Sequence, residues 1–453
     1  MRRLRTRDPV PWLVGLFAAN VLLQRISVPN LSIPIIVPIS VIWVGLVLYA
    51  GVAVLNFRRL LLWLLGAGIS AGLVIAQVLL VEGPFVSVNS WALWMTVWLP
   101  LIVHFVDRRW ETYLKALRGV ANVGLGLAAL SLVFTGVQYL GVPYKDWVAQ
   151  VVPSSLLVSG YVVSYPVTYG SEIYKSNAWI GLEPSFVSFM LGVCVVAAVV
   201  ARLHWAKVSV LLLAMLTTTA GSGLAIVITF VAVTIISGRG RSLFRYALPA
   251  VALAVLFTFT LLGEAILSRV TEAGQSRSST SLRMIEPYLF LWPHWLADPM
   301  GVLLGYGPGS SAWVVANAGI LGLLVPSVAK VLFDYGLIGG LILIALMVST
   351  FVRAPEPRFA LAMAISMFTV QAASPGLVIC AVCVAALWSP AARGRPHAAS
   401  PARRAPRVVD SGPVPERTAI PTRSPVPPPR AERPRVGVAA RSRAARWREA
   451  PQP

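Results

Sequence analysis

The chain has 453 residues, of which 57% are hydrophobic and only 12% are charged, and its mean hydropathy is +0.76. Soluble domains carry roughly 25% charged residues, so this composition excludes an ordinary water-soluble fold. The net charge of +21 would suit nucleic acid, but charge this sparse in an apolar body cannot form a nucleic-acid groove. The three cysteines all lie in apolar runs, which argues against a disulfide framework or a zinc site. The sequence therefore predicts an all-α polytopic membrane protein.

Apolar stretches close to the roughly 20 residues that a membrane-crossing helix needs recur along the whole chain. The pairs within 207–237 and 359–389 could each instead form one long helix or a re-entrant pair. The first span follows an arginine-rich start and precedes no clear cleavage site, so we expect an anchor helix and not a removed signal peptide. About twelve spans are predicted, at 10–24, 33–55, 60–81, 88–106, 119–141, 184–201, 207–220, 223–237, 246–262, 331–352, 359–371 and 376–389.

The distribution of basic residues predicts the orientation. With both termini cytoplasmic, the cytoplasmic segments hold 31 of the 38 Lys and Arg residues and the outside segments hold seven. Cytoplasmic segments of membrane proteins are enriched in these residues, so we expect a multi-pass protein of the cytoplasmic (inner) membrane. The predicted domains are a transmembrane domain, 1–389, and a cytoplasmic tail, 390–453. The tail holds 14 Pro and 14 Arg and is expected to be disordered.

Two external loops, about 142–183 and 263–330, are long enough to carry a functional site, and the larger one follows the ninth span. Charge is nearly absent from the spans, which disfavours an ion-coupled transporter because ion relays need carboxylates within the membrane. The larger loop contains the alternating glycines Gly305, Gly307 and Gly309. Such glycines permit a close backbone approach to a ligand, or simply a tight turn.

Taken in order, short motifs in these loops resemble those of the O-antigen ligase/polymerase family of polytopic bacterial membrane glycosyltransferases. In that family an Arg begins a short helix of the large external loop, a glycine-rich turn follows, and a Gly-Leu-Ile-Gly segment opens the next span. Arg283, the turn at 305–309 and the segment 336–339 stand at those places. The segments 181–185 and 217–223 are similar to two further family motifs, although the second lacks the family's Arg.

This resemblance covers about 170–350 at motif level and the remainder by topology only. Ligases of the family place a His about a dozen residues before the Gly-Leu-Ile-Gly segment. The corresponding stretch here, 324–330, contains no His. The departure favours the polymerase branch, which joins the repeat units of an exported polysaccharide.

The resemblance implies transfer or polymerisation of a polyprenyl-diphosphate-linked glycan at the outer face of the membrane, in surface or exopolysaccharide biosynthesis. Such a reaction needs a cation for the leaving diphosphate, a base for the acceptor hydroxyl and an apolar groove for the lipid. Neither long loop contains an Asp-x-Asp pair, so a metal-independent glycosyltransferase without a cofactor is the simpler hypothesis. The expected partners are the lipid-linked glycan, membrane lipid and other polysaccharide-assembly proteins, and not nucleic acid.

The basic and glycine residues of the larger loop are the candidates for substrate binding. Arg283 is expected to hold the diphosphate as a catalytic residue, with Arg277 or Lys330 assisting and the three alternating glycines lining the site. In the alternative interpretation Arg283 pairs with Glu286, which follows it on the same helical face.

Two further residues are candidates for catalysis. Glu183 could serve as the general base. It could instead be a helix-start carboxylate that favours the helix dipole, because Pro184 stands at a helix-start position. His294 lies between Trp292 and Trp295 and fits either catalysis or an interfacial aromatic belt.

Three other functions remain open from the sequence. A glycosyltransferase that uses a monosaccharide-phosphate lipid would carry acidic residues in its first outside loop, but 24–32 has none. A lipid-linked glycan flippase or exporter should line a central cavity with charge. A non-catalytic subunit of an envelope polysaccharide complex would keep its activity after Arg283→Ala and lose it on removal of 390–453, and the enzyme hypothesis predicts the reverse.

Overall fold

The computed structural model describes residues 8–29, 33–81, 85–168, 170–260, 262–263, 281–319, 323–369 and 374–388. The chain divides into two units, Met1–Gly394 and Arg395–Pro453, and every described residue belongs to the first. The predicted tail, 390–453, lies outside the described residues.

The first half of this unit consists of helices, one small hairpin and a long connection, 157–183, that leads into the last helix. Its elements are α1 (Val10–Leu22), α2 (Ile36–Tyr49), β1 (Ala53–Leu55), α3 (Phe57–Leu80), α4 (Val88–Val97), η1 (Leu99–Ile102), β2 (Val103–Phe105), α5 (Trp110–Tyr139), α6 (Trp147–Val151), η2 (Ser154–Leu156) and α7 (Pro184–Val200).

The second half consists of helices and the turns that join them, with no strand among the elements of its described residues. Its elements are α8 (Trp205–Thr217), α9 (Gly221–Ile236), η3 (Gly240–Leu243), α10 (Phe244–Thr258), α12 (Ser281–Met284), α13 (Glu286–Ala297), α14 (Pro299–Leu304), α15 (Ser310–Asn317), α16 (Ser327–Ser349), α17 (Pro357–Thr369), α18 (Pro375–Ala381) and the π-helical turn η4 (Val382–Ala386).

Each of the twelve predicted spans contains a helix. Four of the helical segments, Phe57–Leu80, Trp110–Tyr139, Gly240–Thr258 and Ser327–Ser349, are long and apolar enough to cross a membrane. The other eight predicted spans contain shorter helices, so the number of twelve crossings stays a prediction. The segment 207–237 forms two helices, α8 and α9, because the chain breaks at Thr218–Ala220. The predicted span 88–106 ends early, since Val103–Phe105 pairs as β2 with β1.

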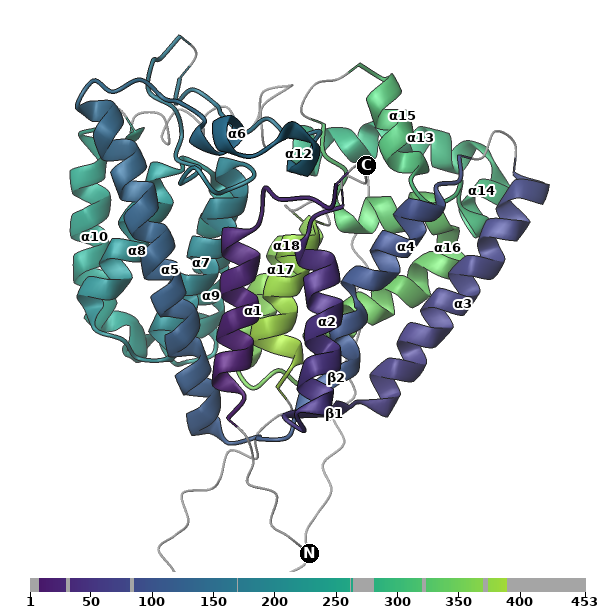
Figure 1. The fold of residues 1–453 in the computed structure, drawn as a ribbon, viewed down its shortest axis with the longest axis horizontal. Helices are drawn as coiled ribbons and strands as arrows, with labels where there is room; N and C mark the ends of the chain where they lie inside the picture. The colour runs from purple at the N-terminus through teal and green to yellow at the C-terminus, as the bar shows by residue number, and fades with distance from the viewer. Residues whose placement is uncertain are drawn as a thin grey trace, which may run out of the picture. The chain divides into compact units, whose positions relative to one another are not determined.

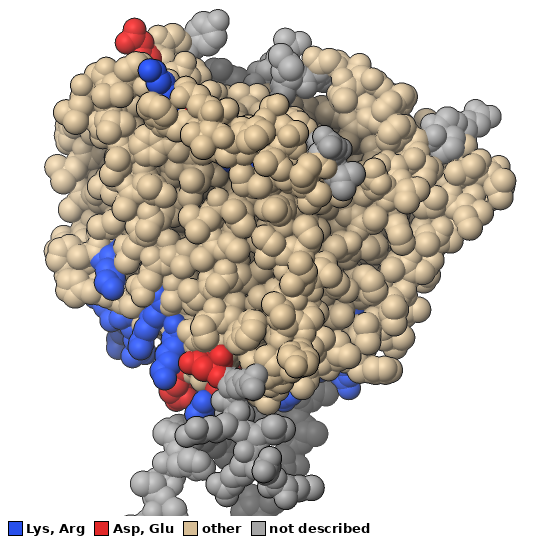
Figure 2. All heavy atoms as spheres, viewed as in Figure 1, with Lys and Arg blue, Asp and Glu red and all other residues tan. Residues whose placement is uncertain are grey.

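The helices run between two ends of the unit (Figure 1). The antiparallel hairpin β1–β2 lies at one end, and the short helices α6, α12, α13, α14 and α15 lie at the other. On the face shown in Figure 2, the basic side chains gather mainly toward the end that carries the hairpin. That end holds the segments predicted to be cytoplasmic, such as Asn56–Arg59. The structure thus separates the two sets of loops that the sequence assigns to opposite sides of a membrane.

Burial differs strongly among the helices. Of the 17 residues of α7, 15 are buried, and this helix packs against α5, α8 and α9. A helix that is apolar on all sides can be buried in this way. By contrast, only 22% of the apolar window of α3 and 11% of that of Gly240–Thr258 are buried. Exposed apolar helix faces are suited to contact with lipid chains.

Candidate functional site

The glycine turn, Gly305–Gly309, packs against a break in α16. Gly305, Gly307 and Gly309 all have positive φ, and so does Gly336 in the middle of α16. A Cβ atom on Gly336 would lie 2.4 Å from the carbonyl oxygen of Leu303. Glycine is therefore required on both sides of this contact, because any side chain would push the two backbones apart.

Asp334 holds the glycine turn in place. Its side chain is buried, with 1% exposure, and it accepts hydrogen bonds from the amides of Gly309 and Ser311 and from the hydroxyl of Ser310. Lys330, one turn earlier on α16, donates to the same carboxylate at 2.7 Å. Four donors thus surround one buried acidic group. Its charge and its hydrogen-bonding capacity are largely satisfied within the chain.

The amides of the glycine turn have internal acceptors. Those of Tyr306 and Gly307 donate to the carbonyl oxygens of Phe333 and Asp334, and that of Gly305 donates to Gly301. In this arrangement the turn fixes α14 against α16. The predicted roles of the glycines and of Lys330 in substrate binding remain predictions, and the structure adds a structural role for each of them.

Glu183 lies at the N-terminus of α7, directly before Pro184. The sequence predicts this helix start correctly. The Glu183 side chain is only 4% exposed and does not cap the helix. It accepts a hydrogen bond from the hydroxyl of Ser185 at 3.2 Å. Burial, with a smaller contribution from the charge of Glu183, raises the pKa of Tyr161 to about 12, so the phenol stays protonated at neutral pH.

The turn that precedes Glu183 is strained. Ala178 and Trp179 have φ values of 55° and 56°, a conformation that L-residues adopt at a cost of order 1–3 kcal/mol each. The Asn177 side chain holds this turn: it donates to the carbonyl of Val163 and accepts from the amide of Trp179. Strain of this kind persists only where the surroundings enforce it, so the backbone before Glu183 is held in one conformation.

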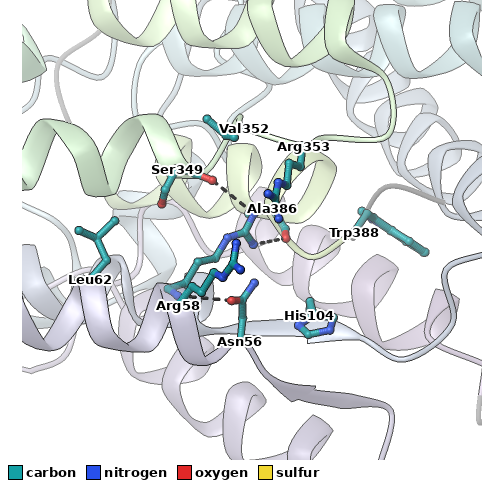
Figure 3. A pocket seen from close by; sticks show the side chains of 10 residues that line it. Asn56, Arg58, Leu62, His104, Ser349, Val352, Arg353, Ala386 and Trp388 are labelled. Atoms are coloured by element: carbon teal, nitrogen blue, oxygen red, sulfur yellow. Dashed lines mark hydrogen bonds between the residues drawn. The ribbon is translucent and has the colours of Figure 1, made fainter. Parts of the chain in front are cut away.

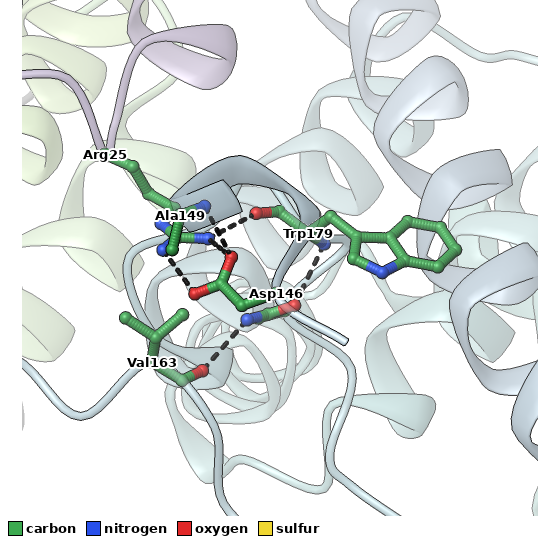
Figure 4. A network of polar contacts seen from close by, with 6 residues as sticks. Arg25, Asp146, Ala149, Val163 and Trp179 are labelled. Carbon is green, nitrogen blue, oxygen red and sulfur yellow. Dashed lines mark hydrogen bonds and ion pairs between the residues drawn. The ribbon is translucent and has the colours of Figure 1, made fainter. Parts of the chain in front are cut away.

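Arg25 joins the end of α1 to this turn (Figure 4). Its guanidinium makes two 2.6 Å contacts with the carboxylate of Asp146 and donates to the carbonyl of Trp179 at 3.0 Å. The Arg25 side chain is 5% exposed. Burial opposes ionisation of Asp146, but hydrogen bonds from Arg25 and from the Ala149 amide outweigh it and hold the Asp146 pKa below its usual value.

Sequence reasoning missed this ion pair. Arg25 and Asp146 are separated by 121 positions, and no pattern in the sequence links them. The only signal was that Arg25 is a single cation at the predicted outer end of the first span. The neighbouring Gln24 accepts from the amide of Leu182, so the end of α1 touches the chain on both sides of Ile180–Gly181. Arg25 therefore supports the segment that carries Glu183.

The remaining predicted residues lie in or near the short helices of the larger loop. Arg283 falls in α12, a four-residue helix, as its third residue, and the structure describes its backbone only. Arg277 lies outside the described residues. His294 is exposed on α13, with its Nδ1 atom 3.0 Å from the carbonyl oxygen of Phe290. Glu286 accepts from the hydroxyl of Ser281.

Comparison of the sequence with protein-family models and with curated proteins finds no match. The coarse features are clear: the chain is a helical protein with several long apolar helices that suit a membrane. The resemblance to a glycosyltransferase family therefore depends on the short motifs alone.

Proposed function

We propose that this protein transfers a glycan from a polyprenyl-diphosphate carrier to an acceptor hydroxyl at the outer face of the cytoplasmic membrane. The observation that carries the proposal is the setting of Glu183: a buried carboxylate at the start of a buried helix, behind a strained turn that Arg25 and Asn177 fix. Strained, over-determined backbone and buried acids are both enriched at functional sites. The order of the motifs in the external loops indicates the class of reaction, which is glycan transfer from a lipid diphosphate.

In the proposed reaction the acceptor hydroxyl attacks the anomeric carbon of the lipid-linked sugar. The hydroxyl proton passes to the carboxylate of Glu183, and the bond from the anomeric carbon to the diphosphate oxygen breaks. The electron pair leaves with the polyprenyl diphosphate. Arg283, with Arg277 assisting, stabilises the charge that develops on it, because a guanidinium pairs bidentately with phosphate oxygens. This division of roles needs no metal ion.

The position of Glu183 at a helix start also suits a carboxylate. It stands at the N-terminal end of α7, where the helix dipole stabilises negative charge by about 0.3–1 kcal/mol. Burial acts in the opposite direction, because it disfavours the charged form.

The test compares two Glu→Gln variants in a deletion strain. Glu183→Gln keeps the shape of the side chain but removes the proton acceptor, so we expect at least a roughly 100-fold loss of transfer. Glu172→Gln is the matched control, because Glu172 is exposed and lies in the same loop. The readouts are the length of the surface glycan and the amount of accumulated lipid-linked repeats, together with the expression level of each variant.

Accumulation of single lipid-linked repeats with Glu183→Gln alone would support a polymerase, and full-length chains left unattached would support a ligase. Equal activity of the two variants at equal expression would exclude Glu183 as the base. Full activity of Arg283→Ala, with loss of activity on removal of 390–453, would support a non-catalytic subunit instead. Abolition of turnover by a chelator in the purified protein would contradict the metal-free mechanism.

A further inference from the structure

A pocket of about 280 Å³ lies at the end of the bundle that carries the hairpin β1–β2. Its walls come from the start of α3, from β2, from the residues that follow α16 and from the end of η4 (Figure 3). Segments far apart in the sequence therefore meet here. The lining residues are Asn56, Arg58, Arg59, Leu62, His104, Ser349, Val352, Arg353, Ala386 and Trp388.

The charge of this pocket is one-sided. Three guanidiniums, those of Arg58, Arg59 and Arg353, line it together with the His104 imidazole, and no carboxylate is among the lining residues. Arg59 is held by the chain itself, because it donates to the carbonyls of Ser349 and Ala386.

Arg58 and Arg353 are exposed, and neither forms a hydrogen bond or an ion pair with another residue in the part of the chain that the structure describes. The acidic residues on neighbouring segments are already engaged. Asp107 is paired with Arg109 at 2.6 Å, and Glu356 is paired with Arg358 at 2.6 Å. The pocket thus keeps a surplus of positive charge that no described group neutralises.

A surplus of positive charge suits an anionic ligand. The remaining walls of the pocket indicate the source of such a ligand. Leu62, Val352 and Trp388 give the pocket an apolar side, and the nearby Leu61 and Leu65 are each 48% exposed on α3. Because α3 is long and apolar enough to cross a membrane, its first turn lies at the depth of lipid headgroups. Arg side chains at that depth bind phosphate oxygens and attract anionic lipids.

We propose that this pocket binds a phosphate group, supplied by the headgroup of an anionic membrane lipid or by a soluble phosphate of the same chemistry. Arg58 and Arg353 hold the phosphate oxygens from two sides, and Arg59 fixes the wall between them. The site lies at the opposite end of the bundle from α6 and the Arg25–Asp146 pair. It is therefore independent of the proposed glycan transfer at Glu183.

The experiment uses the full-length protein in two double variants that remove the same charge from the same end of the bundle. The first is Arg58→Gln/Arg353→Gln, which leaves the structural Arg59 intact. The second, Arg118→Gln/Arg241→Gln, is the matched control, because both of these arginines are exposed and neither lines the pocket. Native mass spectrometry measures phosphatidylglycerol retained from mixed phosphatidylglycerol and phosphatidylcholine nanodiscs. Calorimetry measures the binding of inorganic pyrophosphate.

We expect the pocket variant to retain phosphatidylglycerol on the order of tenfold less than the wild type, with less than about a threefold change in the control. This result supports a lipid headgroup as the source. Loss of pyrophosphate binding in the pocket variant alone, without a lipid preference in the wild type, supports a soluble phosphate. Equal losses in both variants, or no loss in either at unchanged melting temperature, would overturn the proposal.

Discussion

The cluster around Asp334 and the arginine pocket differ in how their charges are balanced. At Asp334 one buried carboxylate receives donors from Gly309, Ser310, Ser311 and Lys330. In the pocket three guanidiniums share one hollow that has no carboxylate in its walls. A buried charge without a partner is costly, whereas a charge at a membrane surface is tolerated. The first cluster therefore stabilises the fold, and the second leaves charge available for a ligand.

The same distinction applies at the predicted outer face. Arg25 and Asp146 neutralise each other and hold the turn before Glu183. In the balance of their charges, Arg25 and Asp146 resemble the Asp334 cluster and differ from the arginine pocket. Charges that other groups of the chain neutralise indicate a structural role. Substitutions of such groups should therefore cost more stability than substitutions in the arginine pocket.

The largest effect is expected for Asp334→Ala. It leaves the amides of Gly309 and Ser311 and the ammonium of Lys330 without their acceptor in a buried site. Loss of one partner of a buried ion pair costs about 3–5 kcal/mol, and the orphaned amides add about 1–3 kcal/mol each. We expect the variant to be recovered as aggregate in size-exclusion chromatography. A monodisperse protein with a wild-type melting temperature would contradict the structural role of Asp334.

A slightly smaller effect is expected for Gly305→Ala. Gly305 has a φ of +81°, and a Cβ atom there would lie 2.4 Å from the backbone nitrogen of Gly336. Separation of the two backbones should cost more than about 4 kcal/mol. Gly319 is the control, because it also has a positive φ, +67°, but nothing within 4 Å of an added Cβ. Gly319→Ala should cost only about 1–2 kcal/mol, and thermal unfolding measures both variants.

Asp146→Asn should destabilise the protein by about 3 kcal/mol, because Arg25 is left buried and unpaired. The effect should depend on pH. Since the Asp146 pKa is lowered in the folded state, the stabilisation is complete above the ordinary aspartate pKa and is lost as the pH falls through the lower, folded value. The difference in melting temperature between wild type and variant should therefore be constant from about pH 7 to pH 5 and shrink below about pH 4. A difference that did not change with pH would contradict the ion pair.

The smallest effect is expected for Arg58→Gln/Arg353→Gln. Neither guanidinium has a partner among the described residues, so removing both charges should change the free energy of unfolding by less than about 0.5 kcal/mol. Relief of repulsion among the three arginines would even raise stability slightly. The measurement is the melting temperature in zwitterionic detergent, without phosphate. A loss as large as that of Asp146→Asn would show that the pocket is structural after all.

Much of the helical architecture follows from local sequence. Apolar runs predicted a helix in each of the twelve spans, and the predicted boundary between the spans 207–220 and 223–237 lies next to the observed break at Thr218–Ala220. Pro184 predicted the start of α7, because proline is favoured at the first position of a helix. The sequence could not decide how many of these helices cross a membrane, since several of them are shorter than a bilayer requires.

By itself, therefore, the sequence determined where the helices lie and which of their ends carry the basic residues, because hydropathy and helix boundaries depend on neighbouring positions. Only the tertiary structure decided which charges meet. It paired Arg25 with Asp146, seated the glycine turn on Asp334 and brought Arg58 beside Arg353. Such contacts join positions tens to hundreds of residues apart, and no local pattern encodes them because they arise only when the helices pack.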